Sequence, residues 1–184
     1  MIGGDFAEVL AAAQEGNELA FSRLWRDCNP ALLRYLRVIA PQSAEDAASE
    51  TWVHVVRGLA RFRGDEQAWR AWLFTTARRR VIDQARRRTR RPEKALEEIL
   101  PNQLPISPDA ADLAIQHIDT RSAMALVAQL PPHQAEVILL RVVAGLDTET
   151  VARLVARTPG AVRVAAHRGL RRLAEILAEA GVTL

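Results

Sequence analysis

Residues 145–173, with the sequence GLDTETVARLVARTPGAVRVAAHRGLRRL, predict two short helices joined by a tight turn. Asp147 is a suitable N-cap for the first helix, and apolar residues follow it at helical spacing. Thr158 can cap the second helix, and Pro159 suits its first position, where a missing N–H loses no hydrogen bond. The second helix also carries cationic residues that point away from its apolar face: Arg163, His167, Arg168, Arg171 and Arg172. This geometry places a recognition helix in the major groove, so the stretch predicts a DNA-binding protein.

The composition of the whole chain predicts an all-α protein. Its 184 residues suit one medium domain or two small ones. Apolar residues make up 49% and aromatic residues only 5%, while Ala, Leu and Arg dominate. No alternation of apolar and polar residues persists long enough to build a sheet.

Several classes of site and location are not expected. The single cysteine, Cys28, excludes a disulfide framework within the chain and a cysteine-rich zinc site, and its place on an apolar stripe favours a packed thiol over a redox switch. The four histidines lie far apart, so we expect no metal and no other cofactor. The N-terminus lacks the pattern of a secretion signal and no apolar run approaches about 18 residues, so we expect a cytoplasmic protein without membrane insertion.

The charge is unevenly distributed along the chain. Residues 78–91 contain eight arginines and only one acid, Asp83. Residues 92–119 contain four prolines, one lysine and six acids, a net charge of −5. Two cationic blocks separated by an acidic segment with prolines suggest two nucleic-acid-binding modules on a tether.

This pattern divides the chain into an N-terminal extension (1–16), a helical domain (17–91), a linker (92–119) and a second helical domain (120–184). In the first domain we expect a helix over 18–27, another from Asn29-Pro30 to Ile39, and a third from Ser43 with a buried stripe of Ala48, Trp52, Val55, Val56 and Leu59. A fourth helix, capped by Asp65, should bury Trp69, Trp72, Leu73, Thr76, Ala77 and Val81. The second domain should hold helices over 120–129 and 132–143, followed by the helix-turn-helix.

Four segments, in this order, resemble the sigma-70 family, in its extracytoplasmic-function class (group IV): residues 20–36 (AFSRLWRDCNPALLRYL), 43–64 (SAEDAASETWVHVVRGLARFRG), 69–87 (WRAWLFTTARRRVIDQARR) and 130–173 (LPPHQ…GLRRL). The resemblance implies two small helical domains, sigma region 2 and sigma region 4, joined by an extended linker. It also implies a sigma factor of RNA polymerase, which directs promoter-specific transcription initiation and is not an enzyme. Region 2 would bind core polymerase and recognise and melt the −10 element, and region 4 would bind the −35 element.

Site residues follow from the same resemblance. In region 2 it assigns core polymerase binding to Asp46, Ser49 and Glu50, and −10 binding to Arg61, Arg63, Trp69, Trp72, Arg78, Arg79 and Arg86. Asp46 can equally act only as an acid near a helix N-terminus. Trp69 and Trp72, three residues apart, are often core residues at that spacing, and the arginines could form a solvated face with an Arg79–Asp83 pair.

In region 4 the resemblance assigns −35 binding to Thr158, Arg163, Val164, Ala165, His167, Arg168, Arg171 and Arg172. Val164-Ala165 replaces the Ser-Arg of the family pattern. The missing arginine removes a bidentate guanine contact worth about 1–3 kcal/mol, while Val164 and Ala165 could touch thymine methyl groups. We therefore expect an altered −35 preference. Arg171 and Arg172 either neutralise phosphates or face solvent.

The partners implied are core RNA polymerase, promoter DNA and an anti-sigma factor, with no small-molecule substrate. The acidic linker is either a solvated tether or a strand that threads into a cationic channel of the polymerase. Two other functions are alternatives to this one. A stand-alone regulator would bind duplex DNA tightly without polymerase, and a nucleic-acid enzyme would need gathered carboxylates or a His–nucleophile pair, for which the sequence has no motif.

Overall fold

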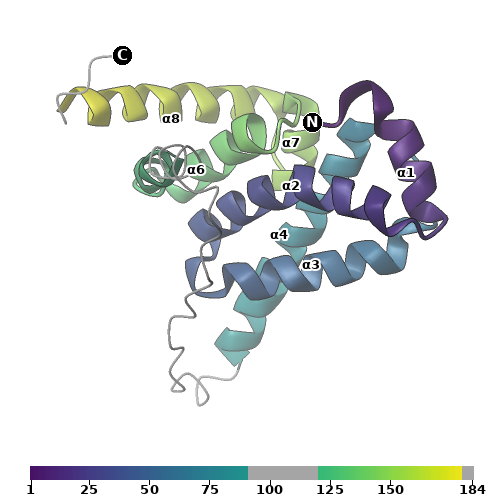
Figure 1. The fold of residues 1–184 in the computed structure, drawn as a ribbon. Coiled ribbons are helices and arrows are strands. Elements are labelled where there is room, and N and C mark those ends of the chain that lie inside the picture. Colours follow the sequence, from purple (N-terminus) through teal and green to yellow (C-terminus); the bar gives the residue numbers. More distant parts are fainter. Residues whose placement is uncertain (91–119, 180–184) are drawn as a thin grey trace, which may run out of the picture.

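The computed structural model describes residues 1–90 and 120–179, and within them every regular element is helical. The expected linker lies outside the described residues. The first part contains α1 (Phe6–Gln14), α2 (Glu18–Ile39), α3 (Ala44–Leu59) and α4 (Glu66–Arg90), with short 3₁₀ turns at Gly3–Asp5 and Pro41–Ser43. The second part contains a helical stretch at 120–127, then α6 (Pro132–Ile138), a π turn at Leu139–Val143, α7 (Thr148–Val155) and α8 (Pro159–Glu179). Figure 1 shows α8 along the edge farthest from α3, with α6 and α7 between α8 and the first domain.

The first sixteen residues, expected to be an N-terminal extension, pack on the first domain. Helix α1 packs along α2 and contributes buried side chains to the core: Phe6, Val9, Leu10 and Ala13. The backbone N–H groups of Ile2 and Gly3 donate to the carboxylate of Glu66 at the start of α4, at 2.8 and 3.0 Å. The amphipathic pattern of α1 is short and rich in alanine, so it signals a helix weakly by itself.

Helix α2 is continuous through Pro30, where the sequence predicted a break. A proline inside a helix removes one hydrogen bond and costs about 3 kcal/mol. The cost is offset because the α2 residues on both sides of it are buried in one core: Leu24, Cys28, Ala31, Leu32, Tyr35 and Leu36. Asn29 does not cap a helix; its side-chain oxygen accepts from Trp52 Nε1 at 2.9 Å.

Helices α3 and α4 begin where the sequence predicted. Asp65 Oδ1 accepts the backbone N–H of Ala68 at 2.8 Å, which confirms the expected cap, whereas the buried Ser43 makes no side-chain cap bond. The expected inward stripe of α4 is buried at Trp69, Leu73, Thr76 and Ala77 and half-buried at Trp72 and Val81. In α3, Val56 is 54% exposed, so its predicted place in the core is wrong.

The helix-turn-helix forms as the sequence predicted. Asp147 Oδ1 accepts the N–H of Thr150 at 2.7 Å at the start of α7, and Thr158 Oγ1 accepts the N–H of Ala161 at 3.2 Å at the start of α8. Between the two helices Ala156 adopts the left-handed conformation, with φ 54°. Glycine is usual there because a Cβ is strained in this region.

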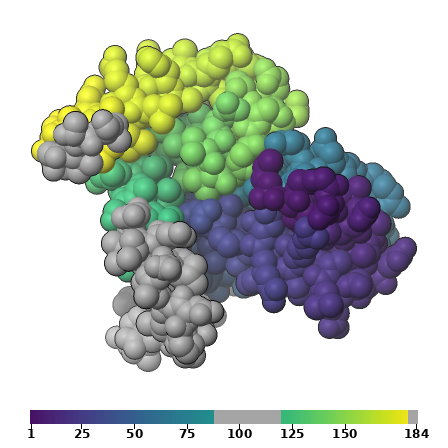
Figure 2. All heavy atoms as spheres, turned by 45° about the horizontal axis from the view of Figure 1, so that its top comes forward, coloured from purple at the N-terminus to yellow at the C-terminus, as the bar shows by residue number. Residues whose placement is uncertain are grey.

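The two domains pack against each other. The buried apolar residues of both form one cluster, and α2 and α4 of the first domain meet α6, the π turn and α7 of the second. The space-filling view shows the second domain, green to yellow, lying directly on the first, purple to blue (Figure 2). Among the described residues, no helix is both long and apolar enough to cross a bilayer.

Candidate nucleic-acid interface

Helix α8 presents an exposed cationic face. Arg163, His167 and Arg168 are exposed, and so is Val164, whose exposed fraction is 49%. Residues three and four apart share a face of a helix, so these side chains form one surface. The cap at Thr158 satisfies a backbone N–H at the start of that surface. The geometry suits a helix that lies in a major groove with an apolar side chain among cationic ones.

Ala165 does not belong to this surface, which corrects its predicted contact with a base. It is only 9% exposed and shares the inward side of α8 with Val162 and Gly169. The spacing of these three residues turns them toward the core, and an ideal Cβ on Gly169 would lie 2.6 Å from Ile138 Cδ1. Val164 is therefore the residue of the unusual pair that can meet a base edge.

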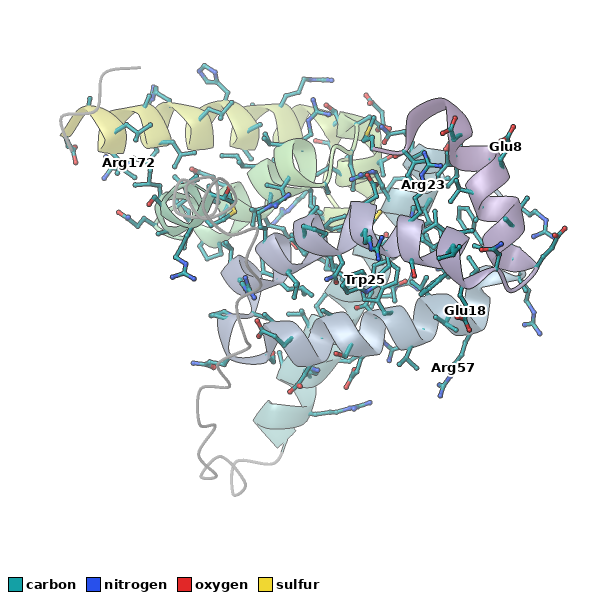
Figure 3. The ribbon with its side chains drawn as sticks, in the orientation of Figure 1. Glu8, Glu18, Arg23, Trp25, Arg57 and Arg172 are labelled. Atoms are coloured by element: carbon teal, nitrogen blue, oxygen red, sulfur yellow. The ribbon has the colours of Figure 1, made fainter. Side chains whose placement is uncertain are left out.

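Arg171 and Arg172 are exposed but share an acid that lies beyond the motif. Glu175 lies 3.5 Å from Arg171 Nε and 3.1 Å from Arg172 Nη1. Figure 3 shows Arg172 on the half of α8 that leads to the C-terminus. Exposed ion pairs of this kind contribute little stability, so both arginines can exchange Glu175 for a phosphate.

Two of the predicted −10 residues lie in the loop between α3 and α4. Arg61 is exposed and no hydrogen bond or ion pair of its side chain is found among the described residues. Arg63 is also exposed, but its Nη1 donates to the carbonyls of Ala60 and Phe62 at 3.0 and 2.7 Å. Arg63 therefore satisfies two carbonyls that follow α3, while Arg61 is free to bind a ligand.

The two predicted tryptophans differ in exposure. Trp69 is 1% exposed and packs against Phe6 and Phe62, so it is a core residue and its predicted contact with a base is corrected. Trp72 is half-buried and stacks on Phe62, with ring centroids 5.2 Å apart and planes 14° apart. An ideal Cβ at Gly58 would lie 2.7 Å from the Trp72 ring, so this glycine makes room for it. The core alternative holds for Trp69, whereas Trp72 remains partly exposed.

The arginines of α4 point in different directions. Arg79 and Arg86 are exposed, and the Arg79–Asp83 pair is absent from the ion pairs of the described residues. Arg78 instead turns toward the second domain, where its Nε lies 2.8 Å from Glu136 Oε1. Of these arginines, Arg79 and Arg86 are therefore available to bind a polyanion, whereas Arg78 is paired with Glu136.

Helix α3 carries the predicted docking residues on one exposed face. Asp46, Ser49 and Glu50 are exposed, and the same face continues through Val53, which is 50% exposed, to Arg57. Figure 3 shows Arg57 extending from α3 away from the rest of the molecule. The sequence pattern did not single out Val53 as part of this face, because whether one valine in a helix is exposed depends on the neighbouring helices. This face therefore combines three exposed polar side chains with one uncovered valine.

The remaining polar sites are structural. Cys28 is buried, and burial raises the pKa of its thiol to about 11, which agrees with the expected packed thiol. The backbone N–H of Thr150, donating to Asp147, lowers the pKa of that carboxyl. Among the described residues, no group of three or more His, Cys, Asp or Glu side chains is placed to hold a metal ion.

Comparison with known proteins identifies both domains. Residues 24–91 match the family described as Sigma-70 region 2, and residues 120–173 match Sigma-70, region 4. The chain is 32% identical to the ECF RNA polymerase sigma factor SigD of Mycobacterium tuberculosis, over 98% of this chain and 88% of SigD. It is 31% identical to the ECF RNA polymerase sigma factor BldN of Streptomyces coelicolor, over 92% of this chain, but it spans only 65% of the length of BldN.

Solved structures share the fold. CnrH in complex with the cytosolic domain of CnrY matches with a TM-score of 0.61 at 22% identity, over 95% of this chain and 97% of that chain. The sigma factor RpoE of Bartonella quintana, in complex with the anti-sigma factor NepR, matches with a TM-score of 0.60 at 22% identity, over 85% and 96%. With both regions matched in order and relatives aligned over nearly its whole length, the chain belongs to the extracytoplasmic-function sigma factors of the sigma-70 family.

Proposed function

We propose that this chain is a non-catalytic specificity subunit of RNA polymerase and that its two domains divide promoter recognition between them. Residues 17–91, with α1 packed on them, act as region 2, and residues 120–184 act as region 4. The observation that carries the proposal is the exposed cationic face of α8, set behind a capped turn. Catalysis belongs to the polymerase, and the chain works in the cytoplasm, where promoter DNA is found.

Region 4 reads the −35 duplex with that face. Arg163, His167 and Arg168 donate to base edges or phosphates, and Val164 contacts an apolar base edge such as a thymine methyl. Arg171 and Arg172, both near Glu175, contact the phosphate backbone. Thr158 holds the start of the helix through its cap and can approach a phosphate there.

Region 2 handles the −10 strand with the loop after α3 and the outer side of α4. Arg61, Arg79 and Arg86 are exposed cations for phosphates. Arg63 holds the loop in shape. Trp72, which is partly exposed and stacked on Phe62, offers an aromatic side chain for an unstacked base.

The exposed face of α3 docks on core polymerase. Glu50 and Ser49 lie at its centre, with Asp46 at the start of the helix and Val53 after them. The acids offer charge complementarity, and the valine supplies apolar area to bury. We also propose control by an anti-sigma factor, because one solved structure with this fold is the sigma factor RpoE bound to the anti-sigma factor NepR, and another is CnrH bound to the cytosolic domain of CnrY.

In vitro transcription with core polymerase on a genomic promoter pool tests the proposal. We expect initiation at promoters that share both elements, and none with core polymerase alone. A stand-alone regulator would bind promoter duplex tightly by itself and would not co-purify with core polymerase; that pair of results would refute the proposal.

A further inference from the structure

A groove along the second half of α2 has both apolar and cationic residues in its lining. The helical stretch at 120–127 forms its other wall, and its volume is about 560 Å³. Small-molecule sites usually measure about 300–1,000 Å³. Pro30, Arg34 and Val38 are spaced four residues apart, so they share one face of α2 and line the groove over about 12 Å. None of the described residues that line it is among those predicted to bind DNA or core polymerase.

The apolar side chains of the groove are only partly covered by the fold. Leu33 and Val38 on α2 and Met124 in the second domain are half-buried, and each packs against the shared core. All three also line the groove, so a ligand there can bury apolar surface that the protein leaves in contact with water. Removal of such surface from water is favourable and has no directional requirement. This part of the groove therefore suits an alkyl chain.

The three arginines in the lining differ in whether they are paired. Arg37 forms an ion pair with Glu45, whose Oε1 lies 3.1 Å from Nη2. The side chains of Arg34 and Arg121 have no hydrogen bond or ion pair among the described residues. Arg121 is exposed, whereas Arg34 is half-buried, and burial lowers the pKa of its guanidinium below the ordinary value.

The groove therefore has an uncompensated positive charge beside its apolar surface. The described residues that line it include no acid. A cation that has lost part of its hydration is stabilised by a counter-charge, and an arginine binds a carboxylate through two parallel hydrogen bonds. Arg121, in the same lining, adds a second positive charge.

We propose that this groove binds a small amphiphilic anion, with its carboxylate at Arg34 and its single alkyl chain against Leu33, Val38 and Met124. Binding is non-covalent, so no bond of the ligand is made or broken. The inference goes beyond the proposed function, because the site requires neither polymerase nor promoter DNA.

Isothermal titration calorimetry of the full chain with decanoate, kept below the concentration at which it forms micelles, tests the proposal. We expect one site with a Kd of about 100 µM. Octanoate should bind about tenfold more weakly, because it buries two methylene groups fewer. Decyltrimethylammonium has the same alkyl chain with a positive head group, and it should not bind.

Two variants and a matched control locate the ligand. Arg34→Gln should weaken decanoate binding at least tenfold, and it leaves no partner unpaired in the fold. Ala125→Phe keeps the charge but places a ring in the groove from the opposite wall, and it should weaken binding as much. Arg57→Gln is the control: it makes the same change in net charge as Arg34→Gln, at an exposed arginine that extends from α3 away from the molecule (Figure 3). Circular dichroism checks that all three variants fold.

Each contrary result is distinct. Equal binding of decanoate and decyltrimethylammonium would show a detergent-like interaction and overturn the proposal, as would equal affinities of Arg34→Gln and Arg57→Gln for decanoate. Flotation with phosphatidylglycerol vesicles separates a free ligand from a membrane: binding to vesicles that is lost in Arg34→Gln would assign the groove to a lipid surface instead. If the chain binds decanoate as described but never supports transcription, the proposed function fails and the ligand site stands.

Discussion

Val164 and Ala165 follow each other along α8 but lie on different sides of it, with exposed fractions of 49% and 9%. The pair that departs from the family pattern therefore does not act as a unit. Val164 faces outward among cations, while Ala165 packs beside Val162 in the core. Promoter preference can change at the first position without loss of stability, whereas the second is constrained by packing.

Val164→Ala should weaken the preference at one −35 base pair by about 1 kcal/mol, because burying a methyl group contributes about 0.8 kcal/mol. The unfolding temperature should not change, since the side chain is exposed. Transcription from a randomised −35 pool measures the preference. Ala165→Ser is the control: its side chain faces inward, so a shift in preference as large as that of Val164→Ala would contradict the assignment.

Glu50→Lys should weaken binding to core polymerase by about tenfold, equal to about 1.4 kcal/mol, because it reverses a charge at the centre of the α3 face. Competition against a labelled sigma factor for core polymerase measures the affinity. Glu8→Lys makes the same change on α1, where Figure 3 shows Glu8 pointing away from the molecule, and should have no effect. Equal losses for both variants would mean that net charge, and not the α3 face, controls docking.

Ala156→Gly should raise the free energy of unfolding by about 0.5–1 kcal/mol. A left-handed residue with a Cβ costs about 1–2 kcal/mol, and part of the gain is lost to the greater freedom of glycine in the unfolded chain. Urea denaturation of the full chain measures it. Ala174→Gly in exposed α8 should instead lower the free energy by about 1 kcal/mol. Destabilisation by both substitutions would show that the turn is not strained.

Cys28 should make the fold sensitive to alkaline pH. Its pKa is raised from its ordinary 9.0 to about 11 by burial, so the unfolded chain releases this proton at lower pH than the folded chain does. Between those pH values the folded state binds more protons, and the free energy of unfolding falls as pH rises. Cys28→Ala should lose less stability than wild type between pH 9 and 11, measured by urea denaturation. Parallel losses in the two proteins would contradict the buried thiol, because Tyr35 titrates equally in both.

Most of the site residues that the sequence predicts lie on exposed faces of the fold, and the corrections share one cause. Ala165 and Val56 were each assigned to the wrong environment, and of the two roles open to Trp69 only the core one holds. Helical spacing says which residues share a face, but two adjacent faces of one helix can look equally apolar until the neighbouring helices are known. For Trp69 the deciding neighbour is Phe6 on α1, a helix that the sequence pattern did not reveal.

The sequence by itself determined the local features. The caps at Asp65, Asp147 and Thr158 each bond a backbone N–H only three residues away, so short stretches of chain suffice to specify where α4, α7 and α8 begin. The order of the sigma motifs is likewise a property of the chain alone.

Only the tertiary structure decided how the domains meet. Arg78 and Glu136 are 58 residues apart, and Tyr35 and Glu136 are 101 apart, with the whole linker between α4 and α6. No local pattern pairs such residues, because their contact depends on how α2, α4 and α6 pack. Because of that packing, Arg78, which the sequence predicts to contact DNA, instead forms an ion pair between the two domains.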